Sequence, residues 1–158
     1  MANTQSMCTS FLGEVLTGTH NFGTAPVRAS GAADTFKGAL YLASATLNAS
    51  TTAYSTTGEV TGAGYSAGGV TVTNATPPTS VNTSTTAGTA YWTPSASLVY
   101  TGVTLTTAFD TVLIYNSTQS NKAVSVHTFG SQTITAGNFT LTMPSNTSST
   151  ALLRLATT

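Results

Sequence analysis

The chain has 158 residues, which is enough for one domain with its own hydrophobic core and too few for two of ordinary size. Only 5% of the residues are charged, against about 25% in a typical soluble domain, and four basic residues cannot neutralise a run of phosphates. We therefore expect no nucleic-acid partner, and the single cysteine and the absence of an apolar run of ~20 residues exclude an intrachain disulfide and a membrane-spanning helix.

The N-terminal region carries the one helical pattern of the sequence. Apolar residues recur there as a stripe, and they are our candidates for contacts with a partner: Met7, Phe11, Leu12, Val15 and Leu16. The stripe predicts a short amphipathic helix from about Ser6 to Thr17, with Gly18 as its stop. Residues 20–34 are small and rich in glycine and alanine, so residues 1–34 are predicted to form a helix and a connecting arm. The stripe packs either on its own domain or on a neighbouring subunit.

From residue 35 onwards the apolar period is two, which is the period of a β-strand. Residues 35–43 read as a half-buried strand, and residues 70–74 place valines inward and threonines outward. Residues 112–115 are apolar on both faces, which predicts a central strand. Residues 75–89, with two adjacent prolines, are predicted to be a mobile surface loop. The remaining strands are predicted at 91–92, 98–105, 123–130, 133–135, 139–143 and 151–155.

This succession of seven to nine short strands, with a turn signal about every ten residues, is typical of an antiparallel β-sandwich or jelly roll. The 36 threonines favour strands as well, because a branched Cβ suits a pleated sheet and crowds a helix. We therefore predict a mainly β protein with one short N-terminal helix, in which residues 35–158 form the β-sandwich domain.

Residues 62–69, GAGYSAGG, contain the G-x-S-x-G pattern of a hydrolase nucleophile turn, centred on Ser66. Asp110 and His127 follow in the order Ser, Asp, His of the α/β-hydrolases. Such a turn needs a buried strand before it and a helix after it, and the flanking residues have the pattern of neither. We interpret the segment as a structural turn anchored by Tyr65, with Ser66 as a surface hydroxyl. A small serine hydrolase that uses Ser66 is the less favoured alternative.

Cofactor and metal signals are weak in the same way. Gly62–Ala67 fits the G-x-G-x-x-G/A pattern of a dinucleotide-binding turn, but no carboxylate stands about 20 residues further on. The titratable residues do not stand at the spacing of a metal site, and nothing selects a catalytic pair of carboxylates among them: Cys8, Glu14, His20, Asp34, Glu59, Asp110 and His127. We expect no catalytic, cofactor-binding or metal-binding residues, and no enzymatic activity.

Four blocks of the sequence have a familiar character: DTFKGALYLASATL, TTAYSTTGEVTGAGYSAGGVTVTN, VLIYNSTQSNKAVSVHTFG and the closing FTLTMP…ALLRLA. Over nearly the full length, they resemble a group of small virion structural proteins of tailed bacteriophages. The resemblance implies a structural role in the particle, and a capsid cement or decoration protein on the head is the role that we favour. The expected partners are then the major capsid protein and other copies of this chain, as a homo-oligomer in the particle.

The expected mechanism is adhesive, because copies that lie over junctions between capsid subunits add buried area many times over. The start of the chain, MANTQSMCTS, lacks the basic and apolar regions of a secretory signal, so we expect synthesis in the host bacterial cytoplasm and a final place in the virion. The alternative is a neck, collar or tail protein, such as a spike or fibre-base protein, whose loops bind host glycans.

Overall fold

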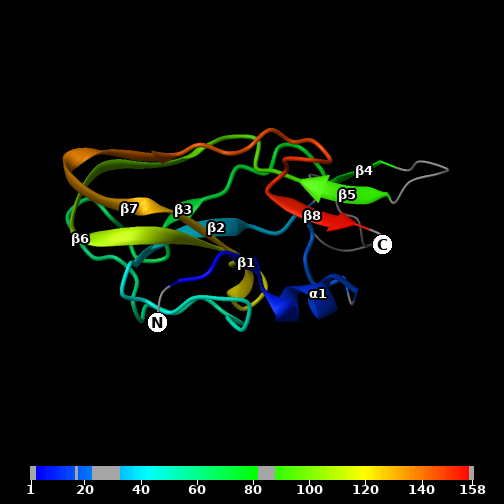
Figure 1. Cartoon of the computed structure of the whole chain (residues 1–158), viewed down its shortest axis with the longest axis horizontal. Helices are drawn as coiled ribbons and strands as arrows, with labels where there is room; N and C mark the ends of the chain where they lie inside the picture. The colour runs from blue at the N-terminus through cyan, green and yellow to red at the C-terminus, as the bar shows by residue number, and fades with distance from the viewer. Residues whose placement is uncertain (1–2, 17, 23–32, 82–87, 157–158) are drawn as a thin grey trace.

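The computed structural model describes residues 3–16, 18–22, 33–81 and 88–156, and it confirms a mainly β protein with one short helix near the N-terminus. The strands of the described part of the chain form two antiparallel sheets, one of five strands and one of three (Figure 1). In chain order the elements are β1 (Ser6–Met7), α1 (Thr9–Leu16), β2 (Phe36–Leu42), β3 (Val70–Thr71), β4 (Thr79–Val81), β5 (Thr89–Trp92), β6 (Leu98–Asn116), β7 (Lys122–Leu141) and β8 (Leu153–Ala156).

The five-stranded sheet has the order β1-β7-β6-β2-β3, and its middle strands carry the core. Residues Val112–Asn116 of β6 are all buried, as the apolar pattern predicts for a central strand. In β2 both Leu40 and Tyr41 are buried, so the prediction of a half-buried strand is wrong for one face. The reason is that the segment after β2 folds back, and the Ser55 carbonyl in this segment accepts a hydrogen bond from the Tyr41 hydroxyl.

The two longest strands, β6 and β7, have 19 and 20 residues and form one continuous hairpin, where the sequence predicts several short strands. The backbone pairing of β6 with β7 continues over this length because its register shifts in several places, among them between Tyr100 and Val103 and between Leu105 and Phe109. Such bulges absorb extra residues while the pairing continues. The residues that pair in this ladder include Thr111, Thr128 and Thr140.

The N-terminal helix is shorter than predicted. It begins at Thr9, and the residues predicted as its first turn form β1, in which Met7 pairs with Ser125 of β7. Edge pairing with a long strand provides those backbone groups with partners that a free helix end would lack. Thr17, the predicted end, lies outside the described residues.

The three-stranded sheet has the order β4-β5-β8 and contains Trp92, which is buried. β4 lies inside the segment 75–89 predicted as a loop, where all three of its residues are exposed and pair with β5. Residues 82–87 lie outside the described part of the chain, so the mobility predicted for this loop is untested there.

Candidate functional site

The five residues predicted to contact a partner have different surroundings. Phe11 is buried in the core, Met7 and Val15 pack against that core while partly buried, and Leu12 is 45% exposed. The side chain of Leu16 lies outside the described part of the structure. The stripe is therefore packed largely on the chain's own core, and Leu12 is the member whose described side chain faces outward.

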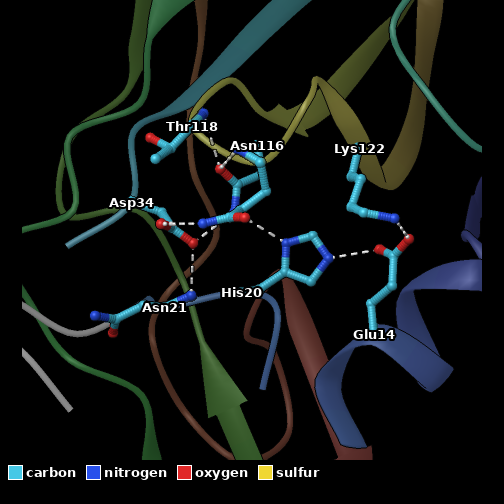
Figure 2. Close-up of polar contacts among 8 residues, drawn as sticks. Glu14, His20, Asn21, Asp34, Asn116, Thr118 and Lys122 are labelled. Atoms are coloured by element: carbon cyan, nitrogen blue, oxygen red, sulfur yellow. Dashed lines mark hydrogen bonds and ion pairs between the residues drawn. The ribbon is translucent and has the colours of Figure 1, made fainter. Parts of the chain in front are cut away.

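A polar network fixes this N-terminal segment to the large sheet (Figure 2). The carboxylate of Glu14, in α1, accepts a hydrogen bond from His20 Nε2 at 2.7 Å. It also forms an ion pair with Lys122 Nζ at 2.6 Å. Burial alone would raise the pKa of Glu14, but the hydrogen bonds from Lys122 and His20 outweigh it, and the pKa lies below its ordinary value. The carboxylate therefore joins the helix to the start of β7.

The other half of the network joins Asp34, just before β2, to Asn116 at the end of β6. The side-chain oxygen of Asn116 accepts from the backbone N–H groups of Thr118 and Gln119, which fixes the orientation of its amide. Its nitrogen therefore donates to Asp34 Oδ2 at 2.7 Å and to His20 Nδ1 at 3.1 Å. Since Nδ1 accepts, the proton of the imidazole is on Nε2, which donates to Glu14.

This network has the residue types of a catalytic site, yet its geometry is that of a structural link. Both nitrogens of His20 are occupied by protein partners, and its side chain is 0% exposed. A substrate would find no free nitrogen there to exchange a proton with. The network instead holds His20 and Phe22 against the core, where the ring of Phe22 stacks on Phe36 with centroids 4.2 Å apart.

Beside the network lies an apolar hollow of about 550 Å³, between α1 and the three-stranded sheet. Figure 1 shows α1 below β8, the two elements whose residues line this hollow together with residues of β5. Its walls are mainly aromatic and aliphatic and include Phe11, Val15, Phe22, Trp92, Leu153 and Leu155. Leu155 is 37% exposed at its edge. We call the hollow, together with Leu12 of α1, which is exposed but does not line the hollow, the apolar face.

In the segment GAGYSAGG, Tyr65 has the anchoring position that the sequence analysis predicts. The Tyr65 hydroxyl accepts from the N–H of Leu40 at 3.0 Å and donates to Glu59 Oε1 at 2.7 Å, so Tyr65 anchors the turn to β2. Ser66 is exposed, and among the described residues no hydrogen bond joins it to Asp110 or His127. Asp110 instead accepts from Asn3 Nδ2 and from the Thr111 hydroxyl.

A serine and a histidine do lie within hydrogen-bond distance elsewhere, on β7. His127 Nε2 lies 2.8 Å from the Ser125 hydroxyl oxygen, two residues apart on β7. This is the distance of a nucleophile and its base. Ser125, however, is only 1% exposed, so a substrate carbonyl cannot reach its oxygen. The pair is therefore interpreted as a partly buried structural hydrogen bond within β7.

Burial lowers the pKa of His127 to about 4, from an ordinary value of 6.5, and this predicts a pH effect on stability. The unfolded chain takes up the imidazole proton near pH 6.5 and the folded chain only near pH 4. Stability should therefore fall as the pH drops through that interval, by as much as about 3 kcal/mol in total. Urea unfolding at pH 7, 5.5 and 4.5 measures the effect.

The control for this pH effect is His127→Gln, which keeps a polar partner for Ser125 but cannot titrate. It should unfold with a much smaller change between pH 6.5 and 4.5. The lowered pKa of Glu14 acts in the same direction, but only below the ordinary value of 4.5 for a glutamate. An equal slope in both proteins would show that His127 is not the titrating group.

The described residues contain no group of three or more His, Cys, Asp or Glu side chains that could hold a metal ion. In the same part of the chain, none of the helical structure is long and apolar enough to cross a membrane. Comparison with known proteins finds no matching family model, no matching curated protein and no matching solved structure.

Proposed function

We propose that this chain is a non-enzymatic structural protein of a tailed-bacteriophage virion, and that it acts as a cement or decoration protein on the head. The resemblance of four sequence blocks to small virion proteins supports the proposal. A nearly uncharged, threonine-rich surface supports it as well, since little charge repulsion keeps such a chain apart from other copies or partners.

The observation that carries the proposal is the apolar face. Leu12 and Leu155 are two of the four large apolar side chains that are exposed in the described structure, and the hollow has apolar walls. Contact with a capsid subunit would remove this surface from water at roughly 25 cal/mol for each Å². One such contact is modest, but many copies bridging subunits on one shell multiply its effect.

Changing the apolar face should weaken binding to the particle. We expect Leu12→Asp and Leu155→Asp each to weaken binding to shells stripped of this protein by about tenfold, because each buries a charge where an apolar contact forms. Val99→Asp is the control, since Val99 is 45% exposed like Leu12 but lies on β6 instead of α1 and, unlike Leu155, does not line the hollow. Binding is measured by co-sedimentation of the purified chain with shells.

The copy number in purified particles tests the place in the virion. Hundreds of copies per particle support a role on the shell, whereas about a dozen would assign the chain to the neck or tail instead. Equal loss of binding in Leu12→Asp and Val99→Asp would show that the apolar face does not mediate binding to the shell. Absence of the chain from purified particles would overturn the proposed function as a whole.

A further inference from the structure

A second depression, distinct from the apolar hollow, lies where the two sheets come together. It has a volume of about 440 Å³. Residues of β1 and β8 line it, together with Ser125–His127 of β7 and Thr89 of β5. We call it the edge groove, because β1 ends the order of the five-stranded sheet and β8 ends that of the three-stranded sheet.

Within the described residues, the two strands that border the edge groove have sheet partners on one side only. β1 pairs with β7, and β8 pairs with β5 from Leu153 to Ala156. An edge strand presents unpaired N–H and C=O groups, and the ligand that matches such a row is another extended backbone. Arg154, Leu155 and Ala156 of β8 are exposed, so this edge is accessible to a partner strand.

The charge of the side chains that line the edge groove indicates which kind of extended segment it can bind. Arg154 lines it and donates from Nη1 to the carbonyl of Ser149, a neutral partner. His127 is the other titratable side chain in the lining, and it carries no charge at neutral pH because burial lowers its pKa to about 4. The edge groove thus offers a positive charge and calls for a carboxylate.

A second copy of this chain would have to give up internal hydrogen bonds to supply a side-chain carboxylate. The sequence contains four, and each is engaged within the chain. Glu14 binds Lys122 and His20, and Asp110 binds Asn3 and Thr111. Asp34 and Glu59 are buried and hydrogen-bonded. Charge complementarity therefore points to a different polypeptide.

We propose that the edge groove binds an extended, acidic segment of another protein, whose backbone pairs with the open edge of β8 and whose carboxylate contacts Arg154. The segment adds a strand at the place where the two sheets of this chain meet. This inference goes beyond the adhesive face at α1, and its test uses the purified chain without particles. Its failure would therefore leave the proposed function standing.

The test uses three synthetic nine-residue peptides that alternate threonine and valine around one central residue. The first carries glutamate there and the second carries lysine. The third keeps the glutamate but has methyl groups on alternate backbone nitrogens, which removes the donors for strand pairing. Calorimetry gives the affinities, and amide shifts of the labelled protein locate the binding. We expect the glutamate peptide to bind at β8, the lysine peptide about tenfold more weakly, and the methylated peptide not at all.

Arg154 is exposed, so Arg154→Gln should fold as the natural chain does. It should bind the glutamate peptide about tenfold more weakly and no longer distinguish it from the lysine peptide. Arg154→Lys keeps the charge and should retain a preference for glutamate, which provides a second test should the first variant fold poorly.

Three results would overturn the proposal. The first is equal affinity for the glutamate and lysine peptides, and the second is undiminished binding of the methylated peptide. The third is the absence of shifts at β8 with all three peptides at millimolar concentration. If the chain without peptide instead dimerises through β8, seen as concentration-dependent sedimentation and shifts there, the occupant is a second copy and the proposed partner is wrong.

Discussion

Replacing Glu59 by alanine is expected to lower the free energy of unfolding by about 3 kcal/mol or more. Glu59 is 6% exposed, and its carboxylate accepts from the Tyr54 hydroxyl, the Tyr65 hydroxyl and the N–H of Gly68, each at 2.7 Å. Burial, reinforced by the hydrogen bond to Glu59, raises the pKa of both tyrosines, so their hydroxyls stay protonated and donate. Without the carboxylate, these donors lose their acceptor inside the protein.

Ser66→Ala is the matched control for Glu59→Ala, since it alters an exposed residue of the same turn. It should change the free energy of unfolding by less than about 0.5 kcal/mol. Urea unfolding at pH 7 compares the two variants with the natural chain. Similar stabilities for both variants would show that the three hydrogen bonds contribute little, and that Glu59 does not hold the turn in place.

Glu59 also illustrates what local sequence patterns can and cannot predict. The pattern around it identifies Tyr65 as the anchor of a turn, which the structure confirms. The pattern treats Glu59 as an isolated charge, however, because nothing near it in sequence reveals that two tyrosines converge on it. The donors to this carboxylate are Tyr54, five residues before it, and Tyr65 and Gly68, which follow it. They come together only when the chain folds back on β2.

Local patterns in the sequence predict strands better than they predict the contacts of the polar network. Alternation predicts the existence of β2 and the buried side chain of Val72, because strand period is a property of neighbouring residues. The strand predicted over 70–74 is nevertheless only Val70–Thr71 in the structure. The link between His20 and Asn116 spans 96 residues, and that between Asp34 and Asn116 spans 82. No local period encodes such pairs. The long ladder of β6 and β7 lies between these cases, since its residues favour strands but its bulges depend on the pairing of the two strands.

The second large effect is expected at Gly69, where the turn enters β3. Its φ is +70°, and an added Cβ would overlap the carbonyl oxygen of Gly38 and lie 2.6 Å from the carbonyl carbon. Gly38 belongs to β2 and pairs with Val70. A side chain at position 69 would therefore push β3 away from β2. We expect Gly69→Ala to cost about 3 kcal/mol or more, of which about 1 kcal/mol reflects the left-handed backbone.

Gly102→Ala separates the two contributions. Gly102 has a similar φ of +63°, but no heavy atom lies within 4 Å of an added Cβ. It should therefore show the backbone cost alone, about 1 kcal/mol, in the same urea unfolding measurement. A cost at Gly69 no larger than that at Gly102 would mean that β2 and β3 separate without penalty. A clearly larger cost would establish that glycine is needed at position 69 because β2 and β3 approach each other closely there.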